Sequence, residues 1–174
     1  GNGIFIVDIP VGAKLYVKEI ETNEHYVLSD EKYPVVFEYM GQDIATVQLL
    51  VYDGNVISNK IIRGRIESNK TDQDGYAIEN VEFGLFKADE TEFIKDNALI
   101  IATSDETGAF VFSCIPFGKW VIKELSCPEQ YVMSDKIHEI NITKDGEILS
   151  LGVVNKRVSG AVKVIKVNKA NTEQ

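Results

Sequence analysis

Apolar and polar residues alternate with a period of two along most of the chain. Such alternation, in segments rich in β-branched and aromatic residues, is typical of half-buried β-strands. Turn-forming clusters separate the segments, for example Asp53-Gly54-Asn55 and Lys144-Asp145-Gly146-Glu147. The predicted strands are Ile4–Asp8, Lys14–Ile20, Ile44–Tyr52, Val56–Asn59, Ile62–Lys70, Val81–Lys87, Leu99–Thr103, Ala109–Cys114, Lys119–Leu125, Glu139–Thr143, Ile148–Asn155 and Ala161–Val167.

A helical period is absent from this pattern, apart from one short helical turn expected within Asp89–Ala98. Many short strands with turn signals between them are typical of a β-sandwich. We therefore predict an all-β protein built from immunoglobulin-like sandwich units.

One sequence phrase occurs twice, as IPVGAKLYVKE at Ile9–Glu19 and as IPFGKWVIKE at Ile115–Glu124. Each copy is followed by a Tyr, a strand pair, an Asn-Lys dipeptide and then a Gly that opens a new strand. Repetition of this kind indicates a tandem array. We predict an N-terminal unit (1–60) that lacks its first strand, a complete unit (61–158), and a tail (159–174) that is the first strand of a following unit. The chain would then be a piece of a longer protein.

Three polar residues of the complete unit fall on the apolar faces of their predicted strands: Lys70, Glu124 and Asn155. Burial favours the neutral form of an amine and of a carboxyl group. A neutral amine is a nucleophile, and a protonated carboxyl group polarises an amide and shuttles protons. If the first and last strands lie side by side, the Lys amine could attack the Asn amide and release ammonia. The alternative is a surface salt bridge with a turn asparagine.

Charge and composition exclude some classes of binding partner. The net charge of −9 argues against nucleic acid or an anionic membrane, and no apolar run is long enough to span a bilayer. The sequence shows no spacing typical of metal ligands, no cofactor motif and no catalytic serine motif. Cys114 and Cys127 are too far apart along a predicted hairpin for a disulfide, so we expect two free, buried cysteines.

The order of motifs resembles the collagen-adhesin B-type (CnaB) domain, also called SpaA-like or prealbumin-like, of Gram-positive surface proteins and pilins. The resemblance covers Gly64–Lys156, and Ile4–Lys60 as a second, N-truncated copy. Ser68 and the Cys127-Pro-Glu-Gln-Tyr segment depart from the family pattern. The motifs that carry the resemblance are Gly64 to Lys70 with Asp72, Val81-Glu-Phe-Gly-Leu-Phe, Thr107-Gly-Ala-Phe-Val-Phe, the IPFGKWVIKE phrase, Cys127-Pro-Glu-Gln-Tyr and Val153-Val-Asn-Lys.

The resemblance implies an intramolecular isopeptide bond between the first and last strands. Lys70 would be the nucleophile, Asn155 the acceptor and Glu124 the autocatalytic acid. No cofactor is implied. A chain that modifies itself once is not an enzyme with turnover.

In the N-terminal unit the resemblance matches Glu19 and Asn59, but the partner lysine would lie upstream. Lys166 is the matching lysine of the tail. The tail strand of one molecule could complete the N-terminal unit of another, which would bring Lys166 near Asn59.

The function implied is a structural stalk segment of a cell-wall-anchored, extracellular adhesin or pilin. Its partners would be neighbouring repeat units, with no membrane contact in this segment. The alternative is a ligand-binding module that recognises a host protein or glycan through the loops Glu31–Asp43 and Asp89–Ala98, with Tyr33, Phe37 and Tyr39 as residues to inspect. A weaker alternative is a sandwich accessory to a secreted enzyme.

Overall fold

The structure, a computed structural model, describes residues 10, 12–36, 40–43 and 57–166. The predicted strands Ile4–Asp8 and Ile44–Tyr52 lie outside these residues, as does the first residue of Val56–Asn59. The regular structure that is described is almost entirely β, with one 3-10 turn at Lys95–Asn97 where a short helical turn was predicted. Among the described residues, no helix is long and apolar enough to cross a bilayer.

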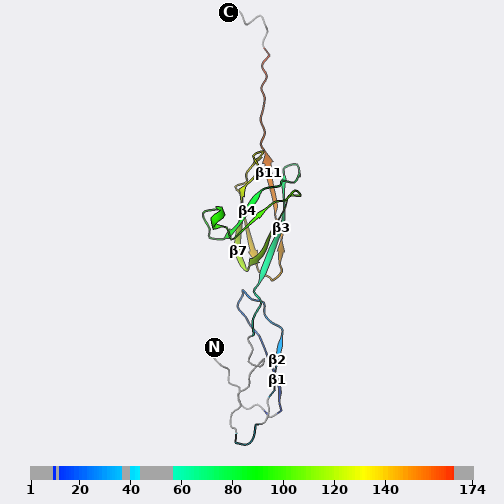
Figure 1. Cartoon of the computed structure of the whole chain (residues 1–174), viewed down its shortest axis with the longest axis vertical. Helices are drawn as coiled ribbons and strands as arrows, with labels where there is room; N and C mark the ends of the chain where they lie inside the picture. Colours follow the sequence, from blue (N-terminus) through cyan, green and yellow to red (C-terminus); the bar gives the residue numbers. More distant parts are fainter. Residues whose placement is uncertain (1–9, 11, 37–39, 44–56, 167–174) are drawn as a thin grey trace, which may run out of the picture.

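The N-terminal unit contributes a two-stranded antiparallel sheet. Strand β1 (Lys14–Lys18) pairs with β2 (Lys32–Val36), and only β1 was predicted. Figure 1 shows this sheet at one end of an elongated molecule, below the larger β-sandwich. The two parts meet through a backbone hydrogen bond from the Ile62 N–H to the His25 carbonyl. The ring of His25 also meets Phe117 edge-on, with centroids 4.9 Å apart.

The sandwich consists of a five-stranded and a four-stranded sheet. The first sheet runs β10-β3-β11-β8, with β6 also paired to β3, and the second runs β5-β4-β7-β9. Strand β3 runs parallel to β11, so the first and last long strands of the sandwich lie side by side as predicted. The strands are β3 Arg63–Asp72, β4 Glu82–Lys87, β5 Ile100–Thr103, β6 Ala109–Pro116, β7 Gly118–Ser126, β8 Tyr131–Val132, β9 Ile137–Ile142, β10 Ile148–Leu149 and β11 Gly152–Arg157.

The core lies between the two sheets and follows the alternation in the sequence. Every second residue of β3 is buried, from Gly64 through Ile66 and Ser68 to Lys70 and Asp72. Because successive side chains of a strand point to opposite faces, this places the predicted lysine on the same inward face as the apolar residue Ile66. The lysine is therefore held inside the sandwich by the alternation that builds its strand.

Three predicted strands differ from the structure. Ile148–Asn155 is two strands, because the backbone N–H of Leu151 donates to the Ser68 hydroxyl at 2.7 Å and interrupts the backbone ladder between β10 and β11. The described residues 161–166 of the strand predicted at Ala161–Val167 form no strand, and neither do residues 57–59. Neither segment has a neighbouring strand to pair with in the described part of the chain.

The prediction that Cys114 is buried is wrong. Cys114 is exposed and has a φ of 58°, next to an irregularity in the pairing of β6 with β3. Gly64 pairs with Ile115 but Ile66 pairs with Phe112, so the β6 strand holds one extra residue at this point. A β-bulge of this kind re-aims a side chain, which turns Cys114 towards solvent. Cys127 is half-buried, and both cysteines are free.

Candidate functional site

The structure brings together the three residues that the sequence analysis singled out in the complete unit. Lys70 on β3 pairs with Val153 of β11, and Asn155 follows two residues later on the same face of β11. Glu124 comes from β7 in the opposite sheet. The amine and the amide thus lie on neighbouring strands, while the carboxyl group faces them from across the core.

All three side chains are removed from solvent. Lys70 is 0% exposed, Asn155 1% and Glu124 3%. Burying an amine and a carboxyl group costs free energy unless each is paired or neutral. Lys70 is nevertheless among the largest fully buried side chains of the described residues. Packing alone does not explain why a lysine and a glutamate are buried here at this cost in free energy.

The Lys70 amine has only weak partners. Its Nζ donates to the backbone carbonyls of Thr71 at 3.2 Å and Val153 at 3.5 Å, and it makes no ion pair with a carboxylate of the described residues. Burial lowers the pKa of Lys70 from its usual value, and the charges of Glu124, Cys127 and Asp72 oppose this effect without cancelling it. Compared with a lysine in water, the site therefore shifts Lys70 towards the neutral, nucleophilic form of the amine.

The Asn155 amide is oriented by Glu124. Its Nδ2 donates to Oε1 of Glu124 at 2.6 Å. The Ser134 backbone N–H makes a longer hydrogen bond of 3.4 Å to the same oxygen. Oε2 of Glu124 and Oδ1 of Asn155 are both buried without a hydrogen-bond partner. These two unpaired oxygens belong to side chains that already contact each other through the bond of 2.6 Å.

Cys127 lies at the edge of this cluster. Burial raises the pKa of its thiol, the Glu124 carboxylate raises it further, and Lys70 and the Asn155 side chain act in the opposite direction. The thiol also donates to the Tyr131 carbonyl at 3.6 Å. Cys127 is therefore a protonated, polar neighbour of the acid and the amide.

A second buried carboxylate, that of Asp72 on β3, links β3 to β11 through an ion pair. Oδ1 of Asp72 accepts hydrogen bonds of 2.9 Å from the backbone N–H groups of Asp74 and Tyr76. Its Oδ2 meets the Arg157 guanidinium at 2.5 Å. The ends of the two strands that carry the amine and the amide are thus fixed together by an ion pair just beyond them.

The N-terminal unit repeats half of the site. Asn59 Nδ2 donates to Oε1 of Glu19 at 2.6 Å and to the Thr22 hydroxyl at 2.8 Å. The Ser29 backbone N–H donates to Oε2 of Glu19 at 2.9 Å. Lys166, the remaining predicted site residue, is exposed in the tail and is not brought to any of these groups.

Sequence reasoning missed Cys127, Ser134 and their counterparts Thr22 and Ser29. The signal was present in the repeat. In both copies a small polar side chain stands three residues after the Glu, and a Ser stands ten residues after it. Aligning the two copies on Glu19 and Glu124 would have revealed both positions.

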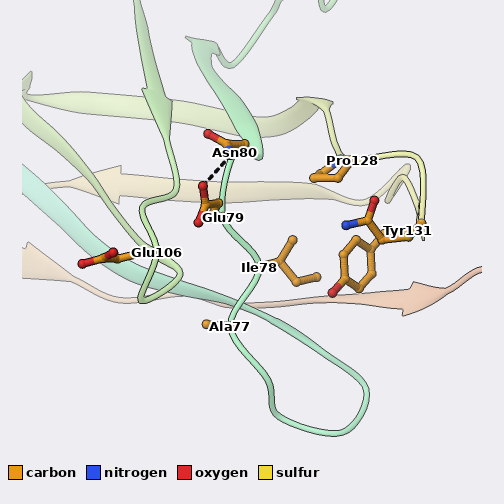
Figure 2. Close-up of a pocket in the computed structure, with 8 residues that line it drawn as sticks. Ala77, Ile78, Glu79, Asn80, Glu106, Pro128 and Tyr131 are labelled. Atoms are coloured by element: carbon orange, nitrogen blue, oxygen red, sulfur yellow. Dashed lines mark hydrogen bonds between the residues drawn. The ribbon is translucent and has the colours of Figure 1, made fainter.

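A surface pocket lies beside the site without including its reactive groups. Figure 2 shows the Ile78 side chain next to the Tyr131 ring, and Asn80 hydrogen-bonded to Glu79, among the residues that line it. The Ile78 backbone N–H donates to the Lys70 carbonyl at 3.0 Å, so the loop that borders the pocket lies against β3. None of Lys70, Glu124 and Asn155 lines the pocket.

Only one of the three residues suggested for ligand binding lies in the described part of the chain, so that alternative stays a prediction. Tyr33 is only 9% exposed, and Phe37 and Tyr39 lie outside the described residues. Groups of His, Cys, Asp and Glu that could hold a metal ion do not occur within the described ranges.

Comparison with known proteins agrees with this architecture. A family model described as the SpaA prealbumin-like fold domain matches residues 64–157, just over half of the chain. No curated protein matches the sequence significantly.

Two solved structures show a similar fold. The Bacillus anthracis TIE protein aligns with a TM-score of 0.64 and 24% identity, over 84% of this chain and 25% of that one. The major pilin subunit BcpA of Bacillus cereus aligns with a TM-score of 0.50 and 17% identity, over 87% of this chain and 41% of that one. The chain thus spans less than half the length of either protein. The all-β, prealbumin-like fold class predicted from the sequence is confirmed, while the tandem arrangement stays a prediction. The chain belongs to the SpaA prealbumin-like fold family.

Proposed function

We propose that this chain is a structural stalk segment of an extracellular pilin or adhesin of a Gram-positive cell wall, stabilised by an intramolecular isopeptide bond between Lys70 and Asn155. One observation carries the proposal: a fully buried lysine lies on the strand beside an asparagine whose amide is hydrogen-bonded to a buried glutamate. Membership of the SpaA family supports the structural role.

The chemistry balances without a cofactor. The neutral Lys70 Nζ attacks Cγ of Asn155, and a C–N bond forms as the bond from Cγ to Nδ2 breaks. Protonated Glu124 polarises the amide and passes protons from the attacking amine to the leaving nitrogen, which departs as ammonia. Because all groups are held by packed strands, proximity provides much of the rate. The reaction happens once per chain, because Lys70 and Asn155 are consumed when the bond forms.

The bond would serve a mechanical purpose. Tension on the stalk enters the sandwich at β3 and leaves it at β11, which run parallel and carry the two reacting residues. An amide bond between Lys70 and Asn155 would transmit the force directly from β3 to β11. The other strands of the sandwich would then not bear the load. It also closes a long loop in the unfolded chain, which on the entropy model stabilises the fold by roughly 4 to 5 kcal/mol.

The test is the intact mass of the purified chain. We expect a deficit of one ammonia per chain relative to the sequence, lost in Lys70→Ala and in Glu124→Gln. Lys144→Ala replaces an exposed lysine on a turn and should keep the deficit. A wild-type chain at its full calculated mass would refute the crosslink, and the structural role would then rest on the fold alone.

A further inference from the structure

Lys70 lies beside a second buried carboxylate, that of Asp72, with which it forms no ion pair. The two residues stand two positions apart on β3, so both side chains face the core, and they are 0% and 1% exposed. The Lys70 Nζ donates at 3.2 Å to the carbonyl of Thr71, the residue between them. The amine therefore lies next to the peptide group that joins Thr71 to Asp72, yet its hydrogen bonds go to main-chain carbonyls.

A direct contact with Asp72 would change the state of the amine. Burial lowers the pKa of Lys70, while the charges of Glu124, Cys127 and Asp72 act to raise it. An opposite charge within about 4 to 6 Å favours the charged form of a titratable group. An ion pair with Asp72 would thus hold Lys70 as an ammonium ion, which is not a nucleophile.

The Asp72 carboxylate is held by other groups. Its Oδ1 accepts hydrogen bonds of 2.9 Å from the backbone N–H groups of Asp74 and Tyr76. Its Oδ2 meets the guanidinium of Arg157, at the end of β11. These contacts hold the carboxylate towards the turn that follows β3. The charge nearest to Lys70 along its own strand is therefore already neutralised by another cation.

Arg157 is itself fixed against that turn. Its backbone N–H donates to Oε1 of Gln73 at 2.8 Å, and its guanidinium lies over the Tyr76 ring, 5.3 Å from the centroid. On its other side, Arg157 pairs with Tyr131 of β8, and the Tyr131 side chain also interacts with the guanidinium. Gln73 and Tyr76 belong to the turn that supplies the N–H groups for Asp72. The carboxylate and its cation are thus positioned by the same few residues.

The other carboxylate that faces Lys70 is engaged in a similar way. Oε1 of Glu124, on β7, accepts a hydrogen bond of 2.6 Å from the amide of Asn155. The Cys127 thiol is the next titratable neighbour, and burial raises its pKa. From β11, Val153 and Asn155 share this inward face, and neither side chain titrates. Each carboxylate beside the amine therefore has a partner of its own, an amide for one and a guanidinium for the other.

We propose that Arg157 is a positioning residue for the crosslink between Lys70 and Asn155: it keeps the Asp72 carboxylate away from Lys70, so that the buried amine has no counter-ion. The inference rests on the proposed function for the reaction itself. Arg157 acts through Asp72 and takes no part in forming the bond. Without Arg157, a buried oxygen of Asp72 loses its partner, and the Lys70 amine on the same strand face is the cation that can replace it.

This role has a signature that rigidity alone would not produce. A lysine paired with a carboxylate releases its proton only at a higher pH, so the pH dependence of crosslinking should move when Arg157 is removed. If Arg157 served only to hold the ends of β3 and β11 together, its removal would slow the reaction by the same factor at every pH. The pH profile of the rate therefore separates the two roles.

The first experiment follows the intact mass of the full chain after dilution from urea into buffers of mildly acidic to alkaline pH. In wild type, the rate of ammonia loss should rise with pH as Lys70 loses its proton. In Arg157→Ala this rise should move to higher pH by about 1 to 3 units, so that crosslinking at neutral pH slows by about tenfold or more. Arg157→Lys keeps a cation beside Asp72 and should stay close to wild type.

A second substitution tests whether the charge of Asp72 is the cause. Asp72→Asn combined with Arg157→Ala removes the competing charge, while the Asn oxygen can still accept hydrogen bonds from Asp74 and Tyr76. We expect this double variant to recover the wild-type pH profile. Lys156→Ala, which removes an adjacent exposed cation, is the matched control and should leave the profile unchanged. A double variant as slow as Arg157→Ala, or a loss in Arg157→Ala that is equal at every pH, would overturn the inference.

A titration distinguishes this inference from the proposed function. Asn155→Ala removes the acceptor, so Lys70 stays a free amine in every chain, and NMR of isotope-labelled lysine side chains then measures its pKa. Adding Arg157→Ala should raise the pKa of Lys70, and adding Arg157→Lys should not. An unchanged pKa would overturn the inference even if the wild-type chain crosslinks. A wild-type chain at its full calculated mass would refute the crosslink, whereas a raised pKa would still show that Arg157 keeps Asp72 from the amine.

Discussion

The backbone N–H of Lys70 donates a hydrogen bond of 2.7 Å to the carbonyl of Gly108. Gly108 has a φ of +78°, and a Cβ atom at this position would lie 2.3 Å from the Lys70 carbonyl oxygen. The turn before β6 therefore holds Lys70 in place through a contact that only glycine permits. The position of Lys70, and with it the spacing of the proposed crosslink, therefore depends on a residue that would take no part in the chemistry.

Gly108→Ala should displace β3 at Lys70, because the new methyl group meets backbone atoms that cannot rotate away. We expect a smaller crosslinked fraction by intact mass and a lower melting temperature. Gly75→Ala is the control, since Gly75 also has a positive φ, of 88°, but no atom within 4 Å of the added Cβ. Equal losses in both variants would show that backbone strain, and not the contact with Lys70, is responsible.

Glu124→Gln should leave an unreacted lysine in the core and make stability depend on pH. Burial lowers the pKa of Lys70 in the folded chain below the 10.5 of a free lysine. Between these two values the unfolded chain binds more protons than the folded chain, so the free energy of unfolding should rise with pH.

Urea unfolding of Glu124→Gln at several alkaline pH values measures this dependence. Wild type is the control, because an amide nitrogen does not titrate and the crosslinked chain should lack the slope. A flat profile in Glu124→Gln would contradict the buried, neutral amine.

Cys127→Val should slow crosslinking, whereas Cys127→Thr should preserve it. The Cys127 side chain neighbours both Glu124 and Asn155, and Thr22 hydrogen-bonds the amide at the matching position of the N-terminal unit. Valine keeps the volume of threonine but removes the polar atom. Intact mass measured over time after cell-free synthesis compares the rates. Equal rates in the two variants would limit Cys127 to packing.

Arg157→Ala should destabilise the sandwich by about 1 to 3 kcal/mol, the cost of leaving a buried polar group without its partner. Burial raises the pKa of Asp72, but two backbone N–H groups and the Arg157 guanidinium outweigh it and hold the pKa below its usual value. The stabilisation is therefore present above the usual pKa of aspartate and is lost as the pH falls through the lowered value.

Urea unfolding at neutral and acidic pH measures the effect of Arg157→Ala. Lys156→Ala removes an adjacent, exposed cation and should change little. A loss of stability in Arg157→Ala that is the same at every pH would argue against the ion pair with Asp72.

The sequence by itself determined which residues face the core. Alternation is a property of a single strand, so the inward placement of Lys70, Glu124 and Asn155 followed from their neighbours alone. The repeated phrase likewise matches Glu19 with Glu124, and the repeated Asn-Lys dipeptide matches Asn59 with Asn155, without any tertiary information. Local information of this kind was enough for the all-β class and for the strand faces on which these residues lie.

Only the tertiary structure decided which strands became neighbours and where the ladder broke. The division of Ile148–Asn155 depends on a hydrogen bond between Leu151 and Ser68, which are 83 residues apart in the chain. The outward turn of Cys114 depends on a bulge opposite β3, and the Asp72–Arg157 ion pair on the parallel pairing of β3 with β11. Alternation decides which side chains of a strand point inward. Contacts between segments that are distant in the chain decide which strands pair and which sheets pack together. For this reason the described residues of the tail, 159–166, have the pattern of a strand but form none.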